Sequence, residues 1–341
     1  MGCFRHILLG GIASVLRYVL KRLVYIVVVF LVASVLIFAL YKSVPGDPAR
    51  LMLEGNKQSM KPEEYEARYQ EAVKKLGLDK PIPIQYFTWL FNTLQGDFGY
   101  SITYKMPVRN MIGVPMKNTI MLNVWSLIPV FLITIPLGIS TAVRRGSRYD
   151  SIVQVVTIIG YSLPFFVIAL LFIFLFAVKI PIFPISGVQT PGMEGTATRM
   201  FLDKLYHMAL PLIVMVFTSL GGLTRYVRAT MIEALRMDYI RTARAKGLSE
   251  KVVIYSHAFR NALIPFITIM TGWFISIFSG SVVIERTFLW NGMGKVIIDA
   301  LNQQDFSVSL AMVMFYLVLA LVGNLLMDLS YGLADPRVKL D

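Results

Sequence analysis

Residues 225–261 read RYVRATMIEALRMDYIRTARAKGLSEKVVIYSHAFRN, and they lie between two long apolar runs. Most of these residues are good helix formers, and the segment is longer than a simple connection between two helices needs. Gly247 and Ser249 provide a stop and a new start, so a second helix is predicted at 250–263. The sequence therefore predicts two short helices between two membrane-spanning segments.

The first of these helices is small in cross-section and positively charged. Thr242, Ala243 and Ala245 stand beside Arg241 and Arg244. Such a helix on the cytoplasmic surface can insert into a groove on another protein. The alternative is a basic loop that only sets membrane topology and contacts lipid headgroups.

The whole chain has the composition of a membrane protein. Of its 341 residues, 56% are hydrophobic and only 16% are charged, and the mean hydropathy is +0.65. Soluble domains carry about 25% charged residues, so this chain lies outside that class. A net charge of +13 is typical of nucleic-acid binders, but here the basic residues lie in loops between apolar runs, where they set topology. The single cysteine, Cys3, excludes a disulfide framework and a cysteine-based metal cluster.

Uncharged runs predict six transmembrane helices, because a bilayer core of about 30 Å needs about 20 mostly apolar residues per helix. The predicted spans are 23–40, 119–143, 152–178, 208–223, 262–284 and 308–329. The third is long enough to tilt or to bend at Pro164.

The distribution of charge predicts the orientation of these spans. With the N-terminus inside, the inner segments hold 17 of the 33 basic residues but only seven of the 20 acidic ones. Both termini are therefore predicted to be cytoplasmic. The resulting organisation is a cytoplasmic segment at 1–22, a first transmembrane helix at 23–41, an extracytoplasmic domain at 42–118 and a transmembrane domain at 119–341, with the cytoplasmic loop 225–261 inside it.

Residues 42–118 have the composition of a small soluble domain. A helix is predicted at 60–76, with Ser59 as its cap and Gly77 at its end, and a shorter one at 84–94. The first helix has an apolar face that is predicted to pack on the membrane domain or in the small domain's own core; it comprises Tyr65, Tyr69, Ala72, Val73 and Leu76. The alternative is an outer cap that contacts a ligand or an external partner.

Two motifs in the loop 225–261 resemble those of binding-protein-dependent ABC transporter permeases. The general pattern of that family is Glu-Ala-Ala, three residues and Gly. Here Arg241-Thr242-Ala243 takes the first three places and Gly247 the last, so the glutamate and the first alanine are replaced. The oligopeptide, dipeptide and nickel permease subfamily has Arg-Thr-Ala-Arg-Ala-Lys-Gly-Leu in this position, as residues 241–248 do. Residues 257–265, His-Ala-Phe-Arg-Asn-Ala-Leu-Ile-Pro, match the stretch that follows it.

Further blocks of the same subfamily follow in order along the chain, from Tyr18 to Lys339. They include Val44-Pro45-Gly46-Asp47-Pro48, Leu76-Gly77-Leu78-Asp79, Gly96-Asp97-Phe98-Gly99, Glu285-Arg286-Thr287-Phe288 with Gly292 and Gly294, and Asp335-Pro336-Arg337. The chain therefore resembles the first of the two permease subunits of oligopeptide ABC importers, the oligopeptide permease B type.

This resemblance implies an all-α membrane protein with six transmembrane helices of the type I ABC importer permease fold. It implies a non-catalytic subunit of the bacterial inner membrane, with an extracytoplasmic domain between the first two spans. The expected partners are a second homologous permease subunit, two cytoplasmic ABC ATPase subunits, an extracytoplasmic substrate-binding protein, a peptide substrate and the lipid bilayer, but no nucleic acid. The chain is expected to bind no metal or cofactor, because ATP and Mg belong to the ATPase subunits.

The resemblance also assigns contact with the ATPases to the loop. Transfer of their movement needs a stiff contact, which a short helix continuous with the fourth and fifth spans would supply. Ala243 and Gly247 are predicted to allow close approach, and Arg241 and Arg244 to form ion pairs or hydrogen bonds. The predicted coupling residues are Asp238, Tyr239, Arg241, Thr242, Ala243, Arg244, Ala245, Lys246 and Gly247.

Polar residues inside the predicted spans are the candidates for a peptide pathway, because a peptide is polar along its backbone and charged at its ends. The predicted pathway residues are Asn123, Ser126, Gln154, Ser162, Ser276 and Ser279, with Thr134, Thr157, Ser281 and Asn324 as further candidates. Helix packing is the alternative role for each of them. Asp328, near the inner end of the last span, is expected to meet the interface or a basic neighbour rather than relay protons.

The sequence lacks the motifs of two enzyme classes. It contains no His-Glu-x-x-His helix and no Gly-x-x-x-x-Gly-Lys-Ser/Thr phosphate loop, so neither an intramembrane metalloprotease nor the ATPase itself is indicated. Two alternatives stay open. One is the same type of importer for dipeptides, nickel chelates or another small solute, and the other is an ion-coupled secondary transporter.

Overall fold

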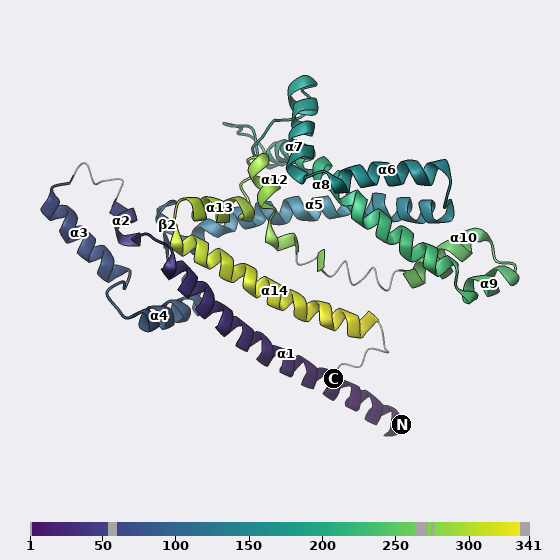
Figure 1. Ribbon diagram of the computed structural model, residues 1–341, viewed down its shortest axis with the longest axis horizontal. Coiled ribbons are helices and arrows are strands. Elements are labelled where there is room, and N and C mark those ends of the chain that lie inside the picture. The colour runs from purple at the N-terminus through teal and green to yellow at the C-terminus, as the bar shows by residue number, and fades with distance from the viewer. Residues whose placement is uncertain (1, 54–59, 263–271, 274–275, 335–341) are drawn as a thin grey trace. The chain divides into compact units, whose positions relative to one another are not determined.

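The computed structural model describes residues 2–53, 60–262, 272–273 and 276–334, and the chain is built almost wholly of helices (Figure 1). The long helices are α1 (Gly2–Ser43), α5 (Val108–Val143), α8 (Ala197–Leu235) and α14 (Phe306–Ala334). The shorter helices are α2 (Pro48–Leu53), α3 (Pro62–Lys75), α4 (Ile82–Leu94), α6 (Arg148–Ser162), α7 (Phe165–Ile173), α9 (Asp238–Ala245), α10 (Glu250–Val252), α12 (Val282–Thr287) and α13 (Met293–Asn302). Two π-helical stretches, η2 (Phe174–Lys179) and η3 (Val253–Phe259), extend α7 and α10, and β1 (Tyr100–Ser101) pairs antiparallel with β2 (Met106–Pro107).

The long helices match the predicted spans where the structure describes them. Among the described residues, four helices are long and apolar enough to cross a membrane: Arg17–Ser43, Val108–Val143, Ala197–Leu235 and Phe306–Leu329. Helix α6 together with α7 and η2 passes the same criterion as a span bent by 102°. The bend lies at Leu163 and Pro164, so the predicted break at Pro164 is confirmed. The predicted span 262–284 lies largely outside the described residues.

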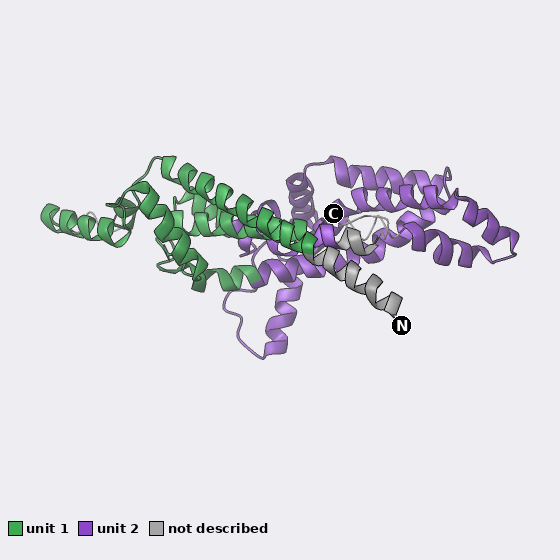
Figure 2. Cartoon of the chain, turned by 90° about the horizontal axis from the view of Figure 1, so that it is seen from below, with its two compact units in different colours: residues 1–116, 296–325, 340–341 green, residues 117–295, 326–339 purple. Residues whose placement is uncertain are grey.

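The chain divides into two compact units (Figure 2). The first unit contains residues 1–116, 296–325 and 340–341, and the second contains residues 117–295 and 326–339. Residues 42–116 of the predicted extracytoplasmic domain thus share a unit with α1 and with the first two-thirds of α14.

A small aromatic core holds the first unit together. Phe38 of α1, Tyr86 and Leu90 of α4 and Leu310 of α14 are buried against one another. The ring of Phe38 lies 5.5 Å from that of Tyr86, edge to face. The hydroxyl groups of Ser34 and Tyr86 are 2.8 Å apart and share a hydrogen bond. These contacts attach α4 firmly to α1.

Helix α3 differs from its prediction at one end. It begins at Pro62, and the N-cap position is held by Lys61, which makes no side-chain cap. The start lies two residues after the predicted one at about residue 60, because Pro62 suits the first helical position. Ser59, the predicted cap, lies outside the described residues. Gly77 has a φ of +64° and ends the helix as predicted.

The apolar face of α3 was predicted to pack on the membrane domain or in a core of its own domain. In the structure no residue of α3 is buried. Its Tyr69 hydroxyl instead donates a hydrogen bond of 2.7 Å to the carboxylate of Asp47.

The second unit is centred on α8, against which α5 and α6 pack at very short range. A Cβ atom added at Gly221 of α8 would collide with the carbonyl oxygen of Thr157 and the side chain of Tyr161, both on α6. A Cβ added at Gly138 of α5 would lie 2.6 Å from the Val227 side chain. Glycine is required at both places, since any side chain would force the helices apart.

Candidate functional site

Helix α9 is the short helix that the sequence predicts in the loop 225–261. It begins after Met237, whose backbone is extended, and it ends before Gly247, which has a φ of +72°. The predicted stop at Gly247 and the predicted new start at Glu250 are both confirmed. The second helix, however, takes π-helical geometry over η3.

The expected continuity of α9 with the neighbouring spans is wrong. Helix α8 ends at Leu235, and Arg236 and Met237 form a turn before α9 begins. Gly247 then breaks the chain again before α10. Rigid attachment of α9 must therefore come from packing rather than from a continuous helix.

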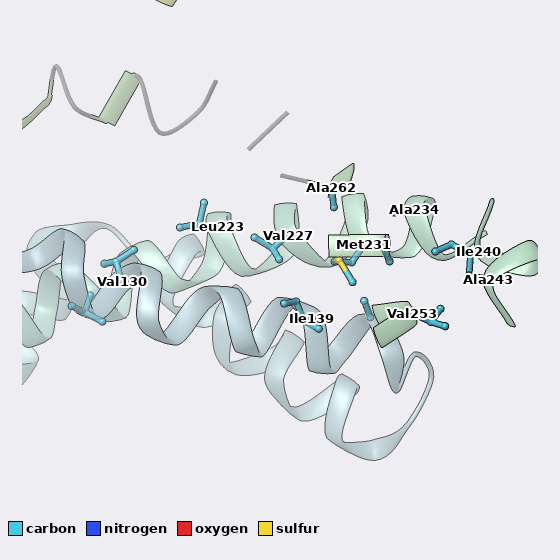
Figure 3. Close-up of a cluster of buried hydrophobic side chains, with 13 residues drawn as sticks. Val130, Ile139, Leu223, Val227, Met231, Ala234, Ile240, Ala243, Val253 and Ala262 are labelled. Atoms are coloured by element: carbon cyan, nitrogen blue, oxygen red, sulfur yellow. The ribbon is translucent and has the colours of Figure 1, made fainter. Parts of the chain in front are cut away.

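Two apolar side chains three positions apart supply that packing. Ile240 and Ala243 of α9 are buried in a cluster with Val253 and Ala258 of η3 and with residues of α5 and α8 (Figure 3). Spacing of three residues places them on one face of the helix. Ala243 is only 5% exposed, so its small side chain allows close approach within this chain. The expectation that Ala243 lies on the outer contact surface is corrected accordingly.

The remaining predicted coupling residues of α9 and its end form an exposed, mainly basic face. This exposed face comprises Asp238, Tyr239, Arg241, Thr242, Arg244, Ala245, Lys246 and Gly247. Arg241 lies 3.6 Å from Asp238, and the Arg244 guanidinium donates two hydrogen bonds, of 2.7 and 3.2 Å, to the carboxylate of Glu250. These hydrogen bonds hold the pKa of Glu250 below its ordinary value and raise the pKa of Arg244.

The predicted pathway residues fall into two groups. Asn123 and Ser126 are buried, and the structure brings them together with Ser276. The Asn123 side-chain amide donates to the carbonyl oxygens of Ile277 (2.9 Å) and Ser276 (3.2 Å), and the Ser126 hydroxyl donates to the Asn123 carbonyl (2.7 Å). Hydrogen bonds of this kind are typical of helix packing, the alternative role predicted for these residues.

The other pathway candidates are not part of that group. Ser162 is exposed at the end of α6, and Ser279 is half-buried. Gln154 lies one turn from Asp150 on α6 and contributes to a different polar cluster.

That second cluster, around Asp150 and Arg228, was missed from the sequence. The Arg228 guanidinium of α8 donates two hydrogen bonds to the Asp150 carboxylate of α6, at 2.8 and 2.7 Å. The backbone N–H of Gly146 donates a third at 2.9 Å. The side chain of Asp150 is 5% exposed and that of Arg228 is 19% exposed. From the sequence, both residues were interpreted only as charges that orient the spans. The one available signal for an ion pair was an acidic residue, Asp150, close to Arg144, Arg145 and Arg148.

A second buried carboxylate, Glu285 of α12, was also missed as a site. One carboxylate oxygen accepts a hydrogen bond of 2.8 Å from the Thr119 hydroxyl, and the other accepts one of 3.0 Å from the backbone N–H of Lys295. Burial raises the pKa of Glu285, and these hydrogen bonds act in the opposite direction. Gly292 leaves room for the carboxylate, since a Cβ atom there would collide with it. The sequence motif contained Glu285 and Gly292 together, but it gave no reason to pair them with Thr119.

Within the described ranges, no group of three or more histidine, cysteine, aspartate or glutamate side chains is placed to hold a metal ion.

Comparison with known proteins covers nearly the whole chain. Residues 134–340 match the family described as "Binding-protein-dependent transport system inner membrane component", and residues 15–131 match the N-terminal family of the same membrane components. The oligopeptide transport system permease protein AppB of Bacillus subtilis (strain 168) is 38% identical, over 94% of this chain and 99% of the relative. The dipeptide transport system permease protein DppB of Escherichia coli (strain K12) and the glutathione transport system permease protein GsiC of Pectobacterium atrosepticum are each 33% identical, over 95% of this chain and 99% of the relative.

Proposed function

The chain belongs to the family of binding-protein-dependent transport system inner membrane components, and we propose that it is the permease subunit of an ABC importer for peptides. The observation that carries this proposal is the match over almost the full length of permease proteins named for oligopeptide and dipeptide transport. The long apolar helices supply the membrane-embedded part. Hydrolysis of ATP takes place on separate ATPase subunits, and this chain supplies the pathway.

Oligopeptides are the proposed cargo. The relative named for oligopeptide transport shares more identity with this chain than those named for dipeptides or glutathione. The residues that choose among cargoes lie partly on the binding protein and on the second permease subunit, so dipeptides or another small solute are the alternative. Uptake competition with unlabelled oligopeptides, dipeptides and nickel chelates distinguishes these cargoes.

The proposed assembly contains this chain, a second permease subunit, two cytoplasmic ATPases and an extracytoplasmic binding protein. This chain crosses the bacterial inner membrane six times with both termini in the cytoplasm, and residues 42–118 lie outside. The distribution of basic residues supports this orientation.

We assign coupling between ATPase and membrane domain to the exposed face of α9. Ile240 and Ala243 fix the helix to the buried cluster. A displacement of its outer face by an ATPase is therefore transmitted into that cluster and is not lost by rotation at a hinge. Arg241, Arg244 and Lys246 offer charged donors to an acidic groove. No atom of the described residues lies within 4 Å of a Cβ added at Gly247, so a partner can approach this side of the backbone.

Purification tests the assembly. Affinity purification of this chain from its native membrane is expected to recover an ATPase and a second permease subunit, and the chain alone is expected to hydrolyse no ATP. A lone homodimer that transports substrate in proteoliposomes with an ion gradient and no ATP would overturn the proposal in favour of the ion-coupled alternative.

Substitution at Gly247 tests the coupling assignment. Gly247→Trp places a large side chain where the partner must approach, whereas Gly247→Asn is the matched control, since asparagine tolerates a positive φ. A Cβ atom at residue 247 would meet no described atom within 4 Å, but an L side chain is strained at a φ of +72°. Gly247→Ala carries that strain without the bulk of tryptophan and so separates the two effects. Gly247→Trp is expected to abolish uptake and substrate-stimulated ATPase activity while Gly247→Asn retains most of both. Unchanged activities in the tryptophan variant would show that the coupling assignment is wrong.

A further inference from the structure

Helix α4 presents three chemically different faces. Tyr86, Trp89, Leu90 and Thr93 face the core of the first unit. Gln85, Thr88, Asn92 and Gln95, which closes the helix, follow a polar face. Ile84, Phe87, Phe91 and Leu94 follow the remaining face at helical spacing.

The third face is apolar and exposed. Phe87 is 66% exposed, Phe91 63% and Leu94 70%. No residue from Ile82 to Leu94 carries a charge, although Lys80 and Asp97 stand just beyond its two ends. Large apolar patches of this kind mark a contact with protein or membrane rather than with water.

The contact between α4 and α1 fixes the depth of this face. Helix α4 lies near α1 (Figure 1). Tyr86 is hydrogen-bonded to Ser34, and its ring and that of Trp89 pack on Phe38. Ser34 lies about 13 Å before the end of α1 at Ser43, at about 1.5 Å per residue. The helix span Arg17–Ser43 is the most apolar of the candidate spans. A bilayer that surrounds the apolar residues of α1 would therefore also reach α4.

Helix α1 also exposes apolar side chains close to α4. Val32, Val35, Leu36 and Leu40 are exposed on α1 in the same stretch that contacts α4. A membrane-spanning helix presents such residues to lipid.

We propose that α4 is an interfacial helix that inserts Phe87, Phe91 and Leu94 among the acyl chains of the leaflet surrounding the C-terminal half of α1. Its polar face, through Thr88 and Asn92, meets headgroups and water. Residues 42–116 are thereby attached to the bilayer at a second place besides α1. The proposal rests on the membrane-embedded position of α1 and is independent of the cargo and of the coupling role of α9.

Spin labels at single cysteines measure this depth directly. Cys3→Ser provides a background without cysteine, and cysteine is then introduced at Phe87, Phe91 or Leu94, with Thr88 and Asn92 as matched controls on the polar face of the same helix. The labelled full complex is reconstituted in phospholipid vesicles, and only variants that retain uptake are measured. Labels at the first three positions are expected to be more accessible to oxygen than to the water-soluble nickel complex Ni-EDDA, and labels at the two controls are expected to show the reverse.

Two outcomes would overturn the proposal. Higher accessibility to Ni-EDDA at Phe87 and Phe91 would place the face in water. Low accessibility to both reagents would place it against another protein, such as the second permease subunit. A measurement on the unaltered chain decides the case where cysteine variants fail to assemble: a phospholipid with a photoreactive diazirine in its acyl chain is expected to label Phe87 and Phe91, and labelling of α1 without any labelling of α4 would contradict the assignment.

Discussion

The helix pairs α6–α8 and α9–η3 belong to the same unit but are joined in opposite ways. Helix α6 meets α8 at backbone distance through Gly221, and a bidentate ion pair between Asp150 and Arg228 connects them. Helix α9 meets η3 through the side chains of Ile240 and Ala243, and its own ion pair, Arg244 with Glu250, is exposed. The contacts between α6 and α8 hinder movement of one helix along the other. The contacts between α9 and η3 leave most of the α9 surface free to contact a partner.

The two ion pairs illustrate the energetic side of this difference. Loss of one partner from a buried pair leaves an uncompensated charge in a poorly solvated place, which is strongly destabilising. Loss of one partner from an exposed pair is compensated by water and by ions. Substitutions in the α6–α8 contact are therefore expected to affect stability, and substitutions on α9 to affect partner contact.

The largest effect is expected from Asp150→Ala. It removes the acceptor of two Arg228 hydrogen bonds and is expected to lower the free energy of unfolding by about 2–3 kcal/mol. This is less than the roughly 3–5 kcal/mol usual for a fully buried pair, because Arg228 retains some exposure. Thermal unfolding of the detergent-solubilised complex measures it. The double variant Asp150→Ala with Arg228→Met is the control, because it leaves no unpaired charge. It should recover part of the loss, and a double variant that sums the two single losses would contradict the paired role.

A smaller effect is expected from Gly221→Ala, at about 1–3 kcal/mol, since the added methyl group meets the Thr157 carbonyl and Tyr161. The adjacent Gly222→Ala is a closely matched control. Its Cβ would have no neighbour nearer than 3.9 Å, so the higher helix propensity of alanine should leave the unfolding temperature unchanged or raised. Equal unfolding temperatures for the two variants would show that α6 and α8 are not in backbone contact.

Local sequence signals predicted the elements of both regions well. Apolar runs of sufficient length gave α8 and the bent pair at Pro164, and Gly247 gave the end of α9 because a positive φ favours glycine. The break between α8 and α9 was not predicted. Arg236 and Met237 are good helix formers, so nothing local marks a turn there, and the docking of Ile240 on η3 is the contact that accompanies it.

The polar contacts between distant segments could not be predicted from local pattern at all. Asp150 and Arg228 are separated by 78 positions, and Thr119 and Glu285 by 166. Taken one at a time, each of these residues has a common explanation: a charge that sets membrane topology, or a small side chain that packs between helices. Only the packing of α6 on α8, and of α12 beside the start of the second predicted span, brings the partners together. The burial of Ala243 was easier to predict from the sequence. Ile240, three residues earlier, is the one large aliphatic residue of α9 and marks its buried face.

The smallest stability effect is expected at the exposed pair, where Arg244→Gln and Glu250→Gln break the same hydrogen bonds. The side chains are 47% and 62% exposed, so neither variant should shift the unfolding temperature measurably. Because the pKa of Glu250 lies below its ordinary 4.5, any contribution of the ion pair to stability is complete above that pH and is lost only as the pH falls through the lowered pKa.

Affinity for the ATPase, measured between pH 6 and 8, should then separate the two variants. Arg244→Gln removes a donor that the partner uses and weakens binding, whereas Glu250→Gln frees that donor and leaves binding unchanged or stronger. Equal weakening by both variants would mean that the ion pair only shapes the turn at Gly247 and that Arg244 does not contact the partner.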